Sequence, residues 1–500
     1  MKISKRKSES CSSSNCVSVD SGQGVTSIAK NTVYLIGSGW MNHVLRFFYV
    51  VALTHYLAPE LYGLLSYGMS WYLAFLPFTG FGIAILLARE IGRDKKSADK
   101  FMSLTLTLRC CVAVSTALVC GFFGWFLESK PEVKSLLIVF SLALIGRSIA
   151  LWVTSVFNAY EANKYTLLLQ GIFRPFEVVV GTSILIAGGG VVAVATVHAI
   201  SWWLQAVSGL VLCGRNFEVV RLNWSWRGLK YILANGLPIG IGFVLMNWLH
   251  RGVIVLSRHM TISDNSLGQL ALAMQVFVII CSIPIAINTA SLPVLSRSVM
   301  RKDGKDLIFV KAMIRSALVF GGFLGLAGLG GGAWLVNIVF GARYKEAGYL
   351  LGFTLWLFIP WTCASAIWRV YLARGQFFVS TLCAGAGALL FTSVIPWSVS
   401  IMDTPGAVLA AGMGMGVWAL TLIWLLARSD DLDVKQTILR PLIIVLLALG
   451  VFLALKSVSN WIALLISWGI LLCGTMLFGV LTKDERRLLG ALKRNNQAKV

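Results

Sequence analysis

Apolar stretches long enough to cross a lipid bilayer follow one another along almost the whole chain. A transmembrane helix needs about 20 apolar residues to span the hydrocarbon layer, which is ~30 Å thick. Of the 500 residues, 57% are hydrophobic and only 13% are charged, whereas soluble globular proteins carry about 25% charged residues. The sequence therefore predicts an all-α integral membrane protein and leaves almost no residues for a soluble domain.

Polar breaks divide the chain into about 14 predicted transmembrane helices, each close to the ~17–25 residues that a tilted helix needs. An even number of spans places both ends of the chain on the same side of the membrane. The predicted spans are 28–54, 64–88, 101–127, 135–157, 165–188, 191–213, 230–256, 270–295, 315–340, 349–373, 377–400, 404–427, 436–455 and 460–481.

Lys and Arg residues gather in alternate loops between these spans. Basic loops follow the second, sixth, eighth and twelfth spans, whereas HYLAPELYG, AGGGV and IMDTPG, after the first, fifth and eleventh, are nearly bare of them. Because basic residues are retained on the cytoplasmic side of short loops, we expect the basic loops and both termini to be cytoplasmic. Arg343 and Lys345, after the ninth span, are the main exception.

Two distant segments share one sequence frame, which indicates an internal repeat. IGSGWMNHVLR ends at Arg46 and IGFVLMNWLHR ends at Arg251, 251 − 46 = 205 residues later, and Pro77 and Pro284 are 207 residues apart. We expect two six-helix lobes related by a pseudo-two-fold axis along the membrane normal, with two appended helices. The predicted divisions are a disordered tail 1–27, an N-lobe 28–214, a linker 215–229, a C-lobe 230–428, appended helices 429–482 and a basic tail 483–500.

The repeated frame places an arginine inside an apolar span twice. Asn42 and Arg46 are four residues apart and share a helix face, as do Asn247 and Arg251. A charge inside a span costs about 2.5–3.5 kcal/mol, so it normally faces a bundle interior or a watery cavity. One interpretation is a pair of cations that holds an anionic substrate. The alternative is that both long side chains reach the headgroups and serve as anchors.

Further polar residues within the spans are candidates for binding or coupling. Arg147 lies near the middle of its span, which favours a cavity. Arg174 and Glu177 are three residues apart and either neutralise each other or take part in ion coupling. His43, His198 and His250 could relay protons or could be structural.

Proline residues in matched spans suggest moving parts. Pro77 and Pro284 lie at equivalent positions of the two predicted lobes. Because proline removes a backbone donor and kinks a helix, bends at these two residues would suit lobes that rock or gate.

Several classes of function do not suit this sequence. It contains no G-x-x-x-x-G-K-[ST] phosphate loop, and its ten cysteines lack metal-ligand spacing, so we expect no ATP hydrolysis, metal or other cofactor. The basic residues are spread over short loops, which argues against a nucleic-acid partner. Outer loops of about ten residues are too short for the catalytic loop of an enzyme.

Stretches in both halves resemble the polysaccharide transporter branch of the multidrug/oligosaccharidyl-lipid/polysaccharide exporter superfamily, which includes Wzx-type O-antigen flippases. The resemblance covers about residues 28 to 480 as a loose pattern. The stretches that carry it are LTHYLAPELYGLLSYGMSW, GFGIAILLAREIGR, FNAYEANKYTLLLQGIFRP, NGLPIGIGFVLMNWLHRGVIVLSR and SLPVLSRSVMRKDGKD.

The resemblance implies movement of undecaprenyl-diphosphate-linked oligosaccharide to the outer leaflet of the bacterial cytoplasmic (inner) membrane, for O-antigen, other lipopolysaccharide or exopolysaccharide. Membrane lipids, a polysaccharide polymerase and a chain-length regulator are the further partners that it implies. Related lipid II flippases have cavity arginines in helix 1 associated with the diphosphate, and Arg46 lies in the corresponding helix. The alternative within the superfamily is a cation-coupled drug or metabolite antiporter, which needs a membrane carboxylate such as Glu177.

Overall fold

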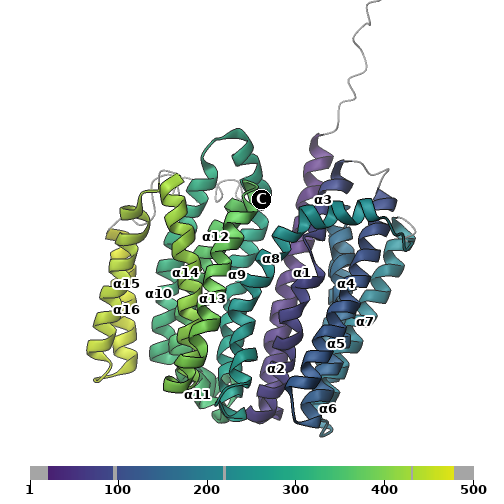
Figure 1. Cartoon of the computed structure of the whole chain (residues 1–500). Helices are drawn as coiled ribbons and strands as arrows, with labels where there is room; N and C mark the ends of the chain where they lie inside the picture. Colours follow the sequence, from purple (N-terminus) through teal and green to yellow (C-terminus); the bar gives the residue numbers. More distant parts are fainter. Residues whose placement is uncertain (1–20, 94–97, 218–220, 430–431, 478–500) are drawn as a thin grey trace, which may run out of the picture.

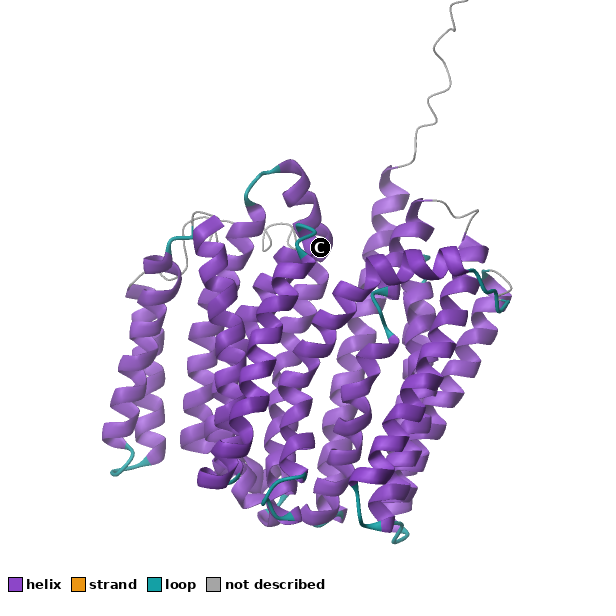
Figure 2. Ribbon diagram, viewed as in Figure 1, coloured by secondary structure: helices purple, strands orange, loops and turns teal. Residues whose placement is uncertain are grey.

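The computed structural model describes residues 21–93, 98–217, 221–429 and 432–477, and these residues form helices and short connections with no strand (Figure 2). A helix satisfies its backbone polar groups within one segment, as hydrocarbon requires. The helices are α1 (Ser21–Tyr56), α2 (Pro59–Phe75), η1 (Leu76–Thr79), α3 (Ile83–Arg93), α4 (Ala98–Leu127), α5 (Pro131–Ala159), α6 (Asn163–Ile186), α7 (Val191–Asn216), α8 (Trp226–Arg258), α9 (Asp264–Arg301), α10 (Lys305–Phe340), η3 (Ala342–Tyr344), α11 (Lys345–Thr354), η4 (Leu355–Leu357), α12 (Phe358–Ala373), α13 (Phe377–Met402), α14 (Thr404–Ser429), η5 (Lys435–Leu439), α15 (Arg440–Leu455) and α16 (Asn460–Leu477).

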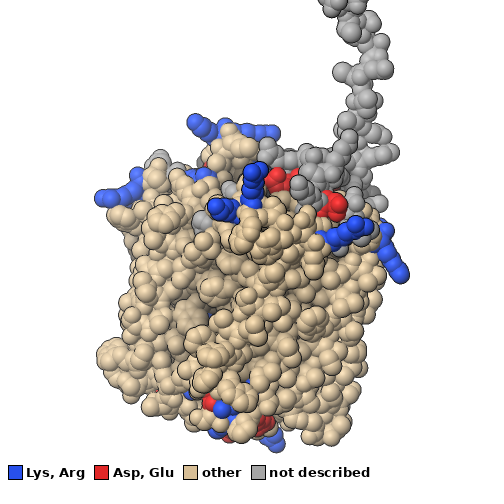
Figure 3. Space-filling model, turned by 45° about the vertical axis from the view of Figure 1, so that its right-hand side comes forward, with Lys and Arg blue, Asp and Glu red and all other residues tan. Residues whose placement is uncertain are grey.

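The predicted all-α membrane architecture is confirmed. Twelve segments of the described chain are long and apolar enough to cross a membrane. The helix α1 and the broken run α2–η1–α3 lie alongside them in the bundle (Figure 1). The described chain begins and ends at the same end of the bundle (Figure 1). In the face shown in Figure 3, charged side chains lie at the two ends and a broad uncharged band separates them.

The packing of the helices repeats in the two halves. In the first half α1 packs on α6, α4 on α5, α5 on α7, and α6 on α7. In the second half the equivalent pairs are α8 with α13, α10 with α11, α12 with α14, and α13 with α14. The pair α15 and α16 packs against α10, outside both sets. We call the helices from α1 to α7, with their connections, the N-lobe, and those from α8 to α14 the C-lobe; α2, η1 and α3 thus belong to the N-lobe and α9 to the C-lobe.

The matched prolines have different surroundings in the two lobes. Pro77 lies in η1, where the second pass is interrupted between α2 and α3. In contrast, α9 continues as one α-helix through Pro284. Among the described helices, the second pass of the N-lobe is thus interrupted at the repeated proline, whereas its C-lobe counterpart is not.

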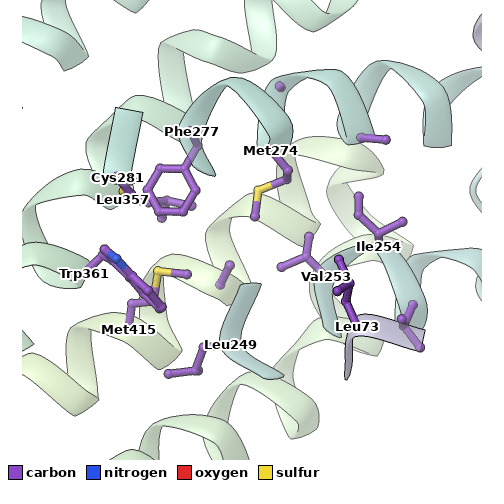
Figure 4. Close-up of a cluster of buried hydrophobic side chains, with 14 of the residues drawn as sticks. Leu73, Leu249, Val253, Ile254, Met274, Phe277, Cys281, Leu357, Trp361 and Met415 are labelled. Carbon is purple, nitrogen blue, oxygen red and sulfur yellow. The ribbon is translucent and has the colours of Figure 1, made fainter. Parts of the chain in front are cut away.

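The two lobes meet where α2 packs on α8 and α9. Leu73 of α2 lies beside Val253 and Ile254 of α8 and near Met274 of α9 (Figure 4). This apolar contact continues into a C-lobe core that contains Phe277, Leu357 and Trp361. The second pass thus belongs to the N-lobe by its order in the chain and joins both lobes by its packing.

Backbone segments from the two lobes touch at both ends of this boundary. Where α2 and α9 begin, a Cβ on Gly268 would overlap the carbonyl oxygen of Pro59, and one on Gly63 would lie 2.8 Å from the Gly268 nitrogen. At the other end, a Cβ on Gly236 would overlap the carbonyl oxygen of Phe81. Glycine permits such close approach between helices. The two lobes are thus in backbone contact near both ends of this boundary.

An ion-pair network reinforces the closure where α2 and α9 begin. Arg258 donates to the two Glu128 oxygens at 3.2 and 3.3 Å and also pairs with Asp264. The Lys130 amine lies 2.6 Å from Asp264. Because Glu128 and Lys130 come from the N-lobe and the other two residues from the C-lobe, this network holds the lobes together.

Candidate substrate-binding cavities

A cavity of about 90 Å³ lies at the lobe boundary, among α1, α2, α5, α6, α7 and α9. We call it the N-cavity because most of its walls come from the N-lobe. Residues 42, 46, 49 and 53 of α1 line it at spacings of three and four, which is the spacing of one helix face. Its ionisable and amide lining residues include Asn42, Arg46, Arg147, Arg174, Glu177 and His198.

Arg46 points into this cavity and toward the C-lobe. Its Nη2 donates to Oε1 of Gln275 on α9 at 3.0 Å and lies 3.7 Å from Sδ of Met69 on α2. The guanidinium group is therefore held in the bundle interior and does not extend toward the headgroups.

Arg147 is oriented by aromatic side chains. Its Nη1 donates to the Tyr72 hydroxyl at 2.7 Å, and its guanidinium lies 4.5 Å from the centre of the Trp202 ring. The Tyr72 oxygen is in turn 2.7 Å from Nε2 of His198. Cation–π contact and a hydrogen bond together fix the direction of this charge without neutralising it.

Arg174 and Glu177 form a buried ion pair, one turn apart on α6. The Arg174 Nη2 also donates to Ser201 Oγ at 3.1 Å and to Gln205 Oε1 at 3.0 Å. The other carboxylate oxygen of Glu177 lies 2.5 Å from Nδ1 of His198. Glu177 is thus shared between a cation and an imidazole, and Arg174 is neutralised within the N-lobe.

A second cavity of about 30 Å³ adjoins the first on its C-lobe side, and we call it the C-cavity. Arg251 and His250 of α8 line it, together with Ser66, Met69 and Gln275, which also line the N-cavity. The two cavities therefore share a wall, and the repeated arginines lie on opposite sides of it.

Positive charge dominates the walls of both cavities. Four arginines (46, 147, 174 and 251) and one carboxylate, Glu177, line them, so with neutral histidines the net charge is 4 − 1 = +3. In the part of the chain that the structure describes, no group of His, Cys, Asp and Glu is arranged to hold a metal ion. The arrangement suits an anion with several oxygen acceptors, because arginine presents its donors as a planar fork.

The sequence matches the family described as "Polysaccharide biosynthesis protein" over residues 28–299, which is more than half of the chain. The chain belongs to this family. No sequence among the curated proteins is significantly similar to it.

Solved structures of transporters share the fold of this family member. The lipid II flippase MurJ in an inward closed conformation aligns with a TM-score of 0.70 at 15% identity, over 91% of this chain and 99% of its own. An inward-facing multidrug resistance MATE transporter of the MOP superfamily aligns with a TM-score of 0.61 at 16% identity, over 79% of this chain and 98% of its own. A MOP superfamily transporter from Pyrococcus furiosus, whose reversed pocket polarity suggests a different function, aligns with a TM-score of 0.58 at 17% identity. The alignment covers 80% of this chain and 96% of that transporter.

Several residues selected from the sequence of this family member meet at the two cavities. Asn42, Arg46 and Arg147 line the N-cavity, and Arg251 lines the C-cavity. Their placement satisfies the geometry expected of a binding site that both lobes share, and their roles stay predictions.

Three other selected residues have different surroundings. The Nδ2 of Asn247 donates to the Leu73 carbonyl oxygen at 2.8 Å, and Asn247 is not among the residues that line either cavity. His43 is half-buried and outside both linings, whereas His250 lines the C-cavity and its ring packs edge to face on Trp361 at 5.1 Å. The polar face at Asn42 and Arg46 is therefore only partly reproduced around Arg251.

Sequence reasoning missed three residues that organise the site in this polysaccharide biosynthesis protein. Tyr72 and Trp202 orient the N-lobe charges together with His198, and Gln275 contacts Arg46 from the C-lobe. Each is a single polar or aromatic residue in an apolar span, which provides little signal by itself. A search for amide residues about three turns inside a span would have found Gln275, which follows the start of α9 by eleven residues.

Proposed function

We propose that this chain is a flippase that moves undecaprenyl-diphosphate-linked oligosaccharide across the cytoplasmic membrane by alternating access, for the synthesis of surface polysaccharide. The observation that carries the proposal is the excess of arginine over carboxylate around the two cavities, in a member of a polysaccharide biosynthesis family. In a poorly hydrated interior such an excess attracts anions and disfavours cations.

A diphosphate suits the chemistry of Arg46 and Arg251, which have no carboxylate partner among the described residues. The guanidinium fork binds phosphate oxygens through two parallel hydrogen bonds, and arginine keeps its charge under physiological conditions. Arg46 comes from the N-lobe and Arg251 from the C-lobe, on either side of one shared wall. A single diphosphate held by both would link binding to the relative position of the lobes.

The described conformation suits an empty stage of such a cycle. The N-cavity of about 90 Å³ has room for about three water molecules, each of which takes ~30 Å³ in the liquid. Pockets that enclose small organic ligands measure roughly 300–1,000 Å³. An oligosaccharide therefore requires the lobes to move apart, and the closures at Gly268 and Gly236 are the contacts that must open.

A cation-coupled drug antiporter is less well supported by this geometry. Such a transporter needs a carboxylate that binds and releases a cation. Glu177 is the carboxylate in the cavity walls, and both of its oxygens are engaged, one by Arg174 and one by His198. The charge around the cavities also disfavours a cationic drug.

The test is a flipping assay with the purified full-length chain in liposomes that contain fluorescent undecaprenyl-diphosphate-linked oligosaccharide. The wild type is compared with the double variant Arg46→Ala, Arg251→Ala. Arg369→Ala is the matched control, because Arg369 lies in the apolar helix α12 and lines neither cavity. We expect the double variant to lose about 100-fold or more in flipping rate, since two charge-assisted contacts are removed, and the control to keep most of it.

Two results would overturn the proposal. One is a double variant that flips the lipid as fast as the wild type. The other is a wild type that leaves the lipid in place while moving a cationic dye in response to a proton or sodium gradient, which would support the antiporter.

A further inference from the structure

Gln275 lies in the wall that separates the two cavities. Together with Ser66 and Met69 it lines both of them. It comes from α9 of the C-lobe, whereas Ser66 and Met69 come from α2 of the N-lobe. The wall between Arg46 and Arg251 is therefore built from both lobes, and it changes whenever α2 and α9 move relative to each other.

The Gln275 side chain is held mainly through its oxygen. Oε1 accepts from Nη2 of Arg46 at 3.0 Å, and this bond joins the N-lobe to the C-lobe. The side chain is buried, with 9% exposure, and among the described residues its Nε2 has no hydrogen-bond partner. A neutral amide is a weaker partner for a guanidinium than an anion is, because charge-assisted hydrogen bonds are roughly twice as strong as neutral ones.

We propose that Gln275 is a latch, a positioning residue that occupies Arg46 while the site is empty and that the diphosphate of the substrate displaces. This inference rests on the proposed function. Displacement breaks the hydrogen bond between Arg46 of α1 and Gln275 of α9 and removes the amide from the shared wall. The two cavities then join, so that Arg46 and Arg251 face the same ligand and binding favours separation of the lobes.

The chain supplies a matched control for this contact. Gln205 also accepts from an arginine Nη2 at 3.0 Å through its Oε1, and it is also buried. Its partner Arg174 is already paired with Glu177, and all three residues belong to the N-lobe. Replacing Gln205 removes an equivalent hydrogen bond that spans no lobe boundary.

The experiment measures the affinity of the purified full-length chain for undecaprenyl diphosphate, with inorganic diphosphate as a second probe. The variants are Gln275→Leu, Gln275→Met, Gln275→Glu, Gln205→Leu and Arg46→Ala, and thermal unfolding shows that each is folded. Two apolar replacements at residue 275 allow the test to proceed if one of them fails to fold.

A latch has a signature that a purely structural residue lacks, which is a gain of affinity when it is removed. We expect Gln275→Leu and Gln275→Met to bind both probes about three- to tenfold more tightly, because the ligand no longer competes with the amide. Gln275→Glu should bind at least about tenfold more weakly, because a carboxylate pairs with Arg46 and repels phosphate. Gln205→Leu should bind as the wild type does.

The outcomes separate the latch from the proposed function. If the wild type binds neither probe, or if Arg46→Ala binds as well as the wild type, the proposed function fails and the latch with it. If Arg46 is required but the apolar Gln275 variants bind with unchanged or lower affinity, only the latch is wrong. A gain seen with undecaprenyl diphosphate and not with inorganic diphosphate would also overturn it, because the anion would then not be the displacing group.

Discussion

The surroundings of Arg46 and Arg251 differ although both arginines end the same sequence frame. Arg46 lies in a polar cavity with Arg147 and the ion pair of Arg174 and Glu177. Arg251 lies in a smaller cavity, where Ile254, Met274 and Val278 form apolar walls. The N-lobe thus carries an extended network of charges, and the C-lobe contributes one charge next to an apolar core (Figure 4).

This difference shows that a repeated sequence preserves the position of a residue in its lobe but not the residues that surround it. The repeat places each arginine at an equivalent point of its lobe, because helix order and packing are the same in both halves. The partners of each arginine come from other helices, whose sequences have diverged. The surroundings of Arg46 and Arg251 can therefore contribute differently to the stability of the protein, although the two arginines hold equivalent positions. The predictions below test this difference between the lobes.

The largest effect is expected from the replacement Glu177→Leu in the N-lobe. It leaves the buried Arg174 without its carboxylate, and removing one member of a buried ion pair costs about 3–5 kcal/mol. The free energy of unfolding of the purified chain in detergent should fall by that amount. The double variant Arg174→Met, Glu177→Leu should recover most of the loss, and a double variant as unstable as the single one would contradict the ion-pair account.

In the C-lobe, the replacement Arg251→Met is expected to change the free energy of unfolding in the opposite direction. Among the described residues Arg251 has no ion-pair partner, and its buried Nε has no hydrogen-bond acceptor. A charge inside a membrane protein is costly, so its removal should raise the free energy of unfolding by up to about 2.5 kcal/mol while it weakens ligand binding. A loss of stability instead would mean that Arg251 has a structural role.

Local patterns in the sequence were sufficient for the architecture. The apolar stretches predicted the long helices of the bundle, twelve of which are apolar enough to cross a membrane in the described chain. The frames that end at Arg46 and Arg251 predicted two lobes with equivalent packing. Spacing on a single helix was equally informative for the site. The three-residue interval between Arg174 and Glu177 corresponds to the ion pair that they form.

Contacts between distant helices could not be predicted in this way. Gln275 is 229 residues from Arg46, and Tyr72 is 126 residues from His198. Neither pair has a spacing that relates one residue to the other, because their distance depends on how whole helices pack. The repeat also does not fix the surroundings of its asparagines, since Asn42 lines a cavity whereas Asn247 bonds to the backbone of α2.

That backbone contact leads to a third prediction, for Asn247→Leu. The Leu73 carbonyl lies four residues before Pro77, which has no N–H to donate, so the Asn247 amide replaces the missing helical bond. Leaving this buried carbonyl unsatisfied should lower the free energy of unfolding by about 1–3 kcal/mol, as measured by chemical denaturation.

Two further variants sharpen this result. Asn42→Leu changes the equivalent residue of the N-lobe and should alter ligand binding with little change in stability. Pro77→Ala restores a backbone donor to the second pass, so it should reduce the cost of Asn247→Leu when the two are combined. If the two costs simply add, the amide does not compensate for the proline.

The smallest change in stability is expected from a replacement of His250, which the sequence analysis names as a candidate proton relay. Its ring packs edge to face on Trp361, a contact that phenylalanine can also make. His250→Phe should therefore change the free energy of unfolding by less than about 1.5 kcal/mol and leave any pH dependence of flipping as it is in the wild type. The contrasting variant is His198→Phe, because His198 contacts Glu177, Tyr72 and Trp202 and its loss disrupts the N-lobe network. A shifted pH profile in His250→Phe, with an unshifted one in His198→Phe, would place proton coupling in the C-lobe and reverse the inequality between the two halves.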